Sequence, residues 1–428
     1  MSATDSRPTI SGARALRLVA LGAVIGIPAA LIAALFIAAV HELEEWLWHD
    51  LPMRLDASGP PWYLVLGLPF AGACLVLAAR TLLPGDGGHA PLDGISVVPT
   101  PISHAPGIAL AAIGTLAFGA VLGPEGPLIA LGSVVGLAVA SIARVGDRER
   151  SVLSTAGSFS ALSALFGGPL VAGMLLIEAG VGFGAALIPV LIPGLVAASL
   201  GYLIFVGLGD WGGLDATALS VPDLPAYDGV HLRDLAVAVA AGIAIALLVE
   251  LVRRLAAGLA VDGRARLGLP VLLLGGGLAV GAVALLADAA GANSQDVLFS
   301  GQASIPSLVT EDSTRIVLVL LAAKALAYAI CLGCGFRGGP VFPAIFLGIA
   351  VAMLAVIAFD VSPTLAVAVG TAAGTVAATR LVFASVLFAA LLVGTAGLDT
   401  VPAASLAAVA AWLTMAAIDE RYPVRRSL

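Results

Sequence analysis

Charged residues are scarce in this chain. Only 11% of its 428 residues are Asp, Glu, Lys or Arg, and Lys324 is its single lysine. An ordinary soluble domain has about 25% charged residues. Hydrophobic residues make up 60% of the chain, and the mean hydropathy is +1.08. So little polar sequence cannot cover a water-exposed surface. The composition therefore excludes a soluble enzyme, a disordered chain and a fibrous protein, and it predicts a polytopic membrane protein.

Cysteine is rare as well. The three cysteines, Cys74, Cys331 and Cys334, cannot form a disulfide framework. The last two form a C-x-x-C pair, but a zinc site usually needs two further ligands, and a redox site of the thioredoxin type needs a βαβ context. We therefore expect a packing role for this pair, with no metal and no cofactor.

The few basic residues lie in short clusters. Thirteen of the 20 fall into four groups of arginines. The groups are at positions 7, 14 and 17; at 144, 148 and 150; at 253, 254, 264 and 266; and at 421, 425 and 426. The positive-inside rule predicts that these clusters and both termini are cytoplasmic, in a multi-pass protein of the plasma (inner) membrane. Short flanks of this kind do not form one basic patch, so nucleic-acid binding is not expected.

Long uncharged runs alternate with short polar segments. The first, Leu18–Val40, has 23 residues, which is longer than the apolar region of a signal peptide, so we expect a retained membrane span. A polar stretch, Asp210–Arg233, divides the chain into two apolar halves. The predicted organisation is a cytoplasmic segment (1–14), a first membrane repeat (15–210), a linker (211–229), a second repeat (230–419) and a short cytoplasmic tail (420–428).

Two segments rich in Gly and Pro interrupt the apolar halves. The first break is Val121-Leu122-Gly123-Pro124-Glu125-Gly126-Pro127-Leu128-Ile129, and the second is Gly335-Phe336-Arg337-Gly338-Gly339-Pro340-Val341-Phe342-Pro343-Ala344. Matched breaks in two halves are typical of an inverted repeat with a substrate site at the repeat interface. Pro favours a first helical turn, so each break predicts a helix start inside the membrane. Two such N-termini form an anion site. The simpler alternative is that Gly and Pro kink packed helices.

Glu125 is an acidic residue inside the first break. An ionisable group within a membrane segment is a functional-site hypothesis by default. A carboxylate at a helix N-terminus is able to occupy an anion site itself and to open it when it is protonated or displaced. The alternative is a structural helix cap.

The breaks resemble motifs of the CLC family of chloride channels and proton/chloride antiporters. Gly-Pro-Glu-Gly-Pro is similar to that family's Gly-Arg-Glu-Gly-Pro, and the second break resembles its Gly-Gly-Ile-Phe-Ala-Pro. The exact sequence of the second break most resembles a little-characterised bacterial ion-transport branch of the family. Phe166–Glu178 resembles the family's Asn-Ala-Pro-Leu…Ile-Glu-Glu helix. The resemblance implies an all-α CLC-type fold of two inverted repeats with tilted and broken helices.

The resemblance also implies roles for individual residues. Glu125 corresponds to the gating glutamate, and the protein is expected to be a homodimer with one pore per subunit. The residues implied to surround a bound chloride or another small anion are Gly123, Pro124, Gly126, Pro127, Gly339, Pro340, Val341 and Phe342.

The anion loop departs from the family pattern. The family's Gly-Ser-Gly-Ile-Pro loop corresponds to Gly88-His89-Ala90-Pro91. His89 then replaces the serine that coordinates the anion, and its ordinary pKa near 6.5 predicts a pH-sensitive contact. The alternative is a loop histidine that faces cytoplasmic solvent.

Four further residues are secondary candidates. Glu178 aligns with a structural glutamate of the family, which places Ala179 where antiporters carry their inner proton-transfer glutamate. Tyr422 lies within one residue of the expected pore tyrosine. Pro124 replaces the arginine of the first motif, and Arg337 is a candidate replacement for its positive charge. Lys324 is expected either to neutralise the anion path or to extend to a membrane interface.

The predicted function is transport of small inorganic anions, chloride first, through a channel-like or weakly proton-coupled path. The alternatives are a strict proton/anion antiporter and a membrane scaffold with a non-conducting pore. A membrane-embedded enzyme that uses Glu125 and His89 as an acid/base pair is disfavoured, because the sequence offers no nucleophile or metal ligands for it.

Overall fold

The computed structural model describes residues 12–57, 59–179, 187–209, 211–214 and 221–422. Within these ranges the secondary structure is helical, apart from two isolated antiparallel bridges. Eight stretches of the described residues are long and apolar enough to cross a membrane: Gly12–Arg54, Trp62–Leu82, Glu125–Ile142, Ile188–Val206, Leu232–Ala289, Thr314–Cys334, Val341–Phe359 and Leu398–Arg421. The predicted all-helical, multi-pass architecture is confirmed.

The chain forms two compact units, which divide within helices α1 and α5. The first comprises Met1–Phe36, Val97–Ala105 and Leu128–Ala218, and the second comprises Ile37–Ser96, Pro106–Pro127 and Leu219–Leu428. These units group residues by contact, whereas the predicted repeats are halves of the sequence. The repeat boundaries therefore stay predictions, and the predicted terminal segments lie partly outside the described residues.

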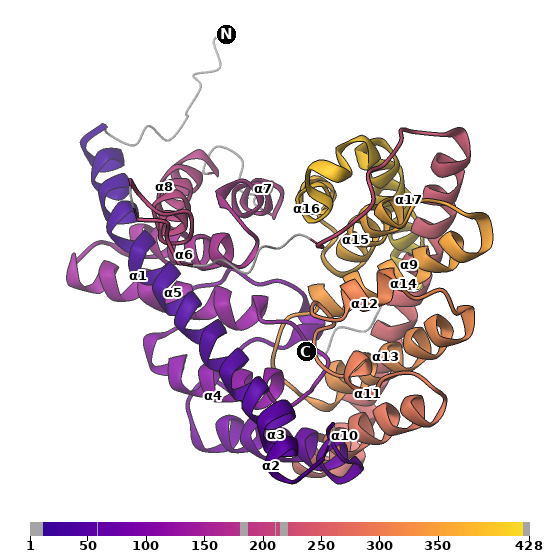
Figure 1. Cartoon of the computed structure of the whole chain (residues 1–428). Coiled ribbons are helices and arrows are strands. Elements are labelled where there is room, and N and C mark those ends of the chain that lie inside the picture. The colour runs from indigo at the N-terminus through magenta and orange to yellow at the C-terminus, as the bar shows by residue number, and fades with distance from the viewer. Residues whose placement is uncertain (1–11, 58, 180–186, 210, 215–220, 423–428) are drawn as a thin grey trace. The chain divides into compact units, whose positions relative to one another are not determined.

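Close packing through small residues holds the first unit together. In it α6 packs on α7 and α8 (Figure 1). A side chain at Gly26 would overlap the backbone of Ala197, and the Ser160 hydroxyl donates to the Gly26 carbonyl at 2.7 Å. Small residues allow membrane helices to approach this closely. The helices that lie wholly or mostly in this unit are α1 (Gly12–Glu45), α5 (Glu125–Ile142), α6 (Asp147–Leu165), α7 (Pro169–Ala179) and α8 (Leu187–Val206). The first turn of α5, with Glu125, belongs to the second unit.

Two helices at the core of the second unit are buried over most of their length. Residues 341–350 of α14 and 364–377 of α15 are buried throughout, as expected for helices that are apolar on every face. These two helices pack on each other, and α13 packs on α9, α10 and α14 (Figure 1). The larger helices are α3 (Trp62–Leu82), α4 (Ala105–Leu116), α9 (Leu232–Gly258), α10 (Arg264–Ala289), α13 (Thr314–Cys334), α14 (Val341–Phe359), α15 (Pro363–Thr379), α16 (Phe383–Val393) and α17 (Val401–Arg421).

Candidate functional site

Both sequence breaks are helix starts. Helix α5 begins at Glu125 directly after Pro124, and α14 begins at Val341 directly after Pro340. Between α13 and α14 the chain turns at Gly335, whose φ of +102° is the left-handed conformation that commonly ends a helix. The predicted helix starts at the two breaks are therefore confirmed.

The two breaks are bonded to each other through their backbones. The Gly123 N–H donates to the Gly339 carbonyl at 2.8 Å, and the Gly339 N–H donates to the Gly123 carbonyl at 2.6 Å. A side chain at Gly339 would overlap the carboxylate of Glu125. Glycine is thus required where the backbone of one break meets the acidic side chain of the other.

The carboxylate of Glu125 occupies the N-terminus of α14. Its Oε1 accepts a hydrogen bond from the Val341 N–H at 2.5 Å, and the residue is 0% exposed. Its Oε2 is buried and has no hydrogen-bond partner among the described residues. Unpaired amides and the helix dipole favour negative charge at this position. The side chain therefore lies where a bound anion would gain the same backbone stabilisation.

Side chains on one face of helix α13 form hydrogen bonds with both breaks. The Tyr328 hydroxyl donates to the Pro340 carbonyl at 2.7 Å, and the Cys331 thiol sulfur accepts from the Val121 N–H at 3.1 Å. Both side chains are buried. Sequence reasoning missed Tyr328 and gave Cys331 only a packing role. The available signal was the spacing of positions 324, 328 and 331, which brings polar side chains to one face of an apolar helix.

Lys324 is the third residue on this face. It is 0% exposed, and its Nζ donates to the carbonyls of Asp296 and Leu298, each at 2.9 Å. The ammonium also lies 4.4 Å from the centre of the Phe346 ring. The expectation that Lys324 extends to a membrane interface is wrong, because the side chain is fully buried and two backbone carbonyls bind its ammonium group. Its effect on the anion path stays a prediction.

Arg337 lies in the second break but is not a free positive charge. The Asp86 carboxylate binds both Arg337 and Arg80, and the two arginines are only 6% and 8% exposed. Burial raises the pKa of Asp86, but the hydrogen bond from Arg80 and the charge of Arg337 outweigh this and lower it. Two guanidinium groups share one carboxylate, so the cluster is net positive.

His89 lies three residues after Asp86 in the chain, and Pro91 begins a one-turn helix (Pro91–Asp93). The imidazole is exposed, while Ala90 is half-buried. Partial desolvation lowers the pKa of His89 from 6.5, and the nearby Arg337 lowers it further, against an opposing effect of Asp93. The imidazole is therefore neutral at pH 7, and its contact with an anion stays a prediction.

The family model for voltage gated chloride channels matches residues 88–415. The chain belongs to this family, the CLC family. It is 30% identical over 356 residues to "Putative ion-transport protein YfeO" of Escherichia fergusonii and to the protein of the same name from Shigella boydii, with 80% of each chain covered. CLC-type anion transport, by a channel or an antiporter mechanism, follows from this membership, and an enzymatic role does not.

Solved CLC structures share the fold. A slow cyanobacterial Cl−/H+ antiporter matches with a TM-score of 0.74 at 18% identity, covering 94% of this chain and 95% of its own. A CLC-type fluoride/proton antiporter matches with a TM-score of 0.69 at 19% identity, covering 98% and 100%. The predicted CLC fold is confirmed.

Three further candidates from the resemblance to the CLC family, Phe342, Glu178 and Tyr422, lie in three different helical segments. Phe342 is buried and packs edge-on against Phe388, with 6.3 Å between ring centres. Glu178 lies in α7 of the first unit. Tyr422 is 64% exposed at the end of α17, where Arg254 donates to its carbonyl at 2.9 Å and lies over its ring. Within the described part of the chain, Tyr422 makes its contacts with Arg254 and not with Glu125, and its pore role stays a prediction.

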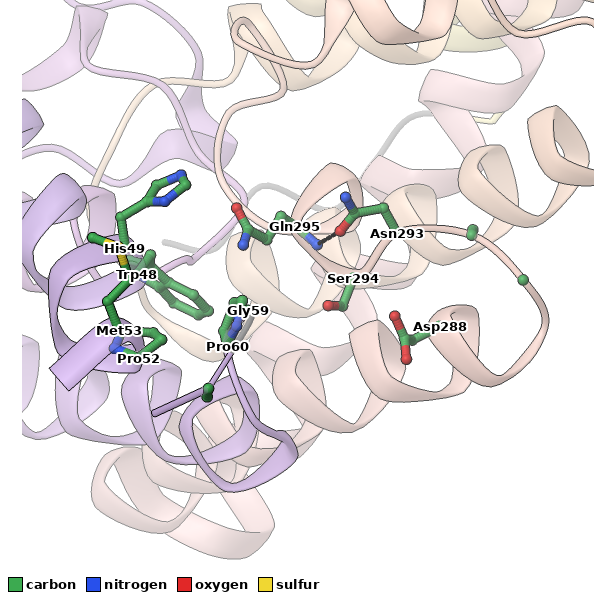
Figure 2. Close-up of a pocket in the computed structure, with 13 residues that line it drawn as sticks. Trp48, His49, Pro52, Met53, Gly59, Pro60, Asp288, Asn293, Ser294 and Gln295 are labelled. Atoms are coloured by element: carbon green, nitrogen blue, oxygen red, sulfur yellow. Dashed lines mark hydrogen bonds between the residues drawn. The ribbon is translucent and has the colours of Figure 1, made fainter. Parts of the chain in front are cut away.

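A separate hollow of about 620 Å³ lies in the second unit between residues 48–60 and 288–295 (Figure 2). His49 and Asp288 are its titratable side chains, and the Asn293 side chain accepts from the Gln295 N–H at 2.9 Å. The residues of the two breaks do not line it. Among the described residues no group of three His, Cys, Asp or Glu side chains forms a metal site.

Proposed function

We propose that this CLC protein carries small inorganic anions, chloride first, through the junction of α5 and α14, and that Glu125 gates the path. The observation that supports this is the hydrogen bond from the Val341 N–H to Glu125 Oε1. An anion and the carboxylate compete for the same amide and the same helix dipole. When Glu125 is protonated or displaced, the N-terminus of α14 is open to the transported anion.

We further propose a channel-like or weakly proton-coupled mechanism. CLC antiporters carry a second glutamate for protons, and Ala179 stands at that position when Glu178 is aligned with the structural glutamate. Without an inner carboxylate, protons lack the usual second relay group. Strict proton/anion exchange is the alternative, and two proteins of the same fold, a Cl−/H+ antiporter and a fluoride/proton antiporter, favour it.

The proposed assembly is a homodimer in the inner membrane with one pore per subunit and both termini cytoplasmic. The orientation rests on the arginine clusters at the chain ends, at 144–150 and at 253–266. The dimer rests on family membership. Cysteine labelling near each terminus in intact cells and mass measurement in detergent test these two points separately.

Flux from proteoliposomes, with the internal pH recorded at the same time, tests the proposed function. Wild type is compared with Glu125→Gln, which keeps the shape of the side chain and removes its charge. Glu420→Gln, at an exposed site on α17, is the matched control. We expect wild type and E420Q to carry chloride alike, and E125Q to lose the part of the pH dependence of flux that comes from protonation of the Glu125 carboxylate.

Three outcomes decide between the alternatives. Chloride flux with little proton movement supports the channel-like mechanism. Proton movement in fixed stoichiometry against chloride supports strict exchange. It would show that Ala179, in place of the inner glutamate, does not prevent proton coupling. No flux of chloride or fluoride from well-folded wild type and E125Q contradicts transport and supports a non-conducting scaffold.

A further inference from the structure

The loop before His89 has an unusual backbone. Four consecutive residues, Gly85, Asp86, Gly87 and Gly88, have φ values of +91°, +49°, +68° and +102°. Glycine adopts this left-handed region freely, but Asp86 does so at a cost. A turn hydrogen bond, from the Gly88 N–H to the Gly85 carbonyl at 2.9 Å, closes the loop. Strained backbone of this kind persists when its surroundings hold it in place.

Two buried arginines hold the strained residue. Arg80, from α3, binds the Asp86 carboxylate with two parallel hydrogen bonds of 2.8 and 2.9 Å. Arg337, from the second break, binds the same carboxylate and also donates from Nε to the Asp86 carbonyl at 2.9 Å. Bidentate guanidinium–carboxylate pairing fixes direction as well as distance. The position of Asp86 is therefore set relative to both α3 and the second break.

The same arginines are themselves tied to the helices that flank the breaks. Arg80 donates from Nη1 to the carbonyl of Gly335 at 2.7 Å, at the end of α13. The Arg337 N–H donates to the Thr115 hydroxyl at 3.3 Å, near the end of α4. The cluster thus joins the loop at residues 85–91 to the chain on either side of the anion junction.

We propose that Asp86 is a positioning residue that fixes the 85–91 loop against the second break and thereby sets the selectivity among anions. This rests on the proposed function, because it takes the loop with His89, Ala90 and Pro91 as one wall of the anion path. Without the Asp86 charge, two buried guanidinium groups face each other without a counter-ion. The loop then keeps only the weaker hydrogen bond from Arg337 to the Asp86 backbone carbonyl, and the spacing between the loop and α14 changes.

A purely structural role makes a different prediction. It would lower stability while every folded molecule kept the wild-type preference among anions. The first readout is therefore the ratio of chloride to fluoride flux in the same liposomes, which does not depend on how much protein folds. Asp86→Asn removes the charge, Asp86→Glu keeps it, and Asp419→Asn is the control, because Asp419 pairs with Arg380 at 3.0 Å on the surface.

A second readout does not depend on transport. In a Cys74→Ser background, which removes the exposed native thiol, Ala90→Cys places a single accessible thiol in the loop. Its labelling rate by a water-soluble maleimide reports the position of the loop. We expect D86N to change both the flux ratio and this rate by a factor of about three or more, with D86E closer to wild type and D419N unchanged.

The outcomes separate this proposal from the proposed function. An unchanged flux ratio in a conducting D86N protein overturns the selectivity role, and an unchanged labelling rate overturns the positioning role. If wild type carries no anion, the proposed function and the selectivity role both fail, and the labelling rate alone decides whether Asp86 positions the loop. If D86N does not fold, Arg337→Lys, which keeps the charge but loses the bidentate geometry, takes its place in both measurements.

Discussion

The hydroxyl of Tyr328 lies 2.7 Å from the carbonyl oxygen of Pro340, the residue immediately before α14. The next residue, Val341, gives its N–H to Glu125. The start of α14 is therefore held by α13 on one side and bound by the gating candidate on the other. This arrangement couples the geometry of the proposed anion site to a helix that lies outside both breaks.

Replacing Tyr328 with Phe removes the donor and leaves the buried Pro340 carbonyl without it. We expect a loss of about 1–3 kcal/mol in the free energy of unfolding, together with altered anion flux at equal protein content. Thermal unfolding in detergent and liposome flux measure the two effects. Tyr63→Phe, at an exposed position, is the control. Wild-type stability and flux in Y328F would show that the hydroxyl does not support the start of α14.

The three thiols are expected to differ sharply in reactivity. Cys74 is exposed, whereas Cys331 and Cys334 are buried between helices. Cys74 lies on the outer face of the membrane-crossing helix α3. A small maleimide that partitions into the detergent micelle should therefore label one thiol per folded chain, and three after denaturation, because reagents do not reach buried side chains. Mass spectrometry counts the labels, and Cys74→Ser should remove all labelling of the folded protein. Rapid labelling of Cys331 would mean that the contact with Val121 opens readily.

Lys324 is expected to stabilise the fold as a buried side chain rather than to extend to the membrane interface. Lys324→Met removes the donor for the buried carbonyl of Leu298 and the half-buried carbonyl of Asp296, each 2.9 Å from its Nζ. Leaving two such acceptors unsatisfied costs about 1–3 kcal/mol each, so the midpoint of thermal unfolding should fall clearly. Arg315→Met, which removes an exposed cation with one carbonyl contact, is the comparison. Equal midpoints for the two variants would contradict this role.

The two breaks, their helix starts and the membrane architecture were predictable because each follows from local sequence. Pro at a first helical turn and long uncharged runs are properties of neighbouring residues. Glu125 was identified for the same reason, since it stands out as a charge within apolar sequence. These features need no knowledge of which segments meet in space.

The contacts of α13 and of Asp86 were not predictable in this way. Tyr328 looks like any aromatic residue in an apolar helix, and Asp86 looks like a residue of a polar turn. Their roles depend on partners such as Arg337, which lies 251 positions from Asp86. Lys324 shows the same limit, because the sequence could not reveal that backbone carbonyls 26 and 28 positions away satisfy its charge.

The pH dependence of transport separates His89 from Glu125. Burial and Arg337 lower the pKa of His89 from 6.5, so the imidazole is neutral at pH 7 and gains a proton only as the pH falls below that value. The added positive charge attracts anions. If the anion passes His89, its flux should therefore rise on acidification and not on alkalinisation. Glu125 also takes up protons, so the measurement uses an E125Q background, in which the remaining acid-dependent change belongs to other groups.

In that background, His89→Ser restores the serine of the CLC motif and removes the titrating group. We expect E125Q to show chloride flux that increases between pH 7 and pH 5, and E125Q with H89S to show flux that is flat over this range. His104→Ser, at a histidine that is half-buried in another turn, is the matched control and should retain the increase. If the double variant keeps the same acid-dependent rise, His89 is a solvent-facing loop residue and the anion does not sense its charge.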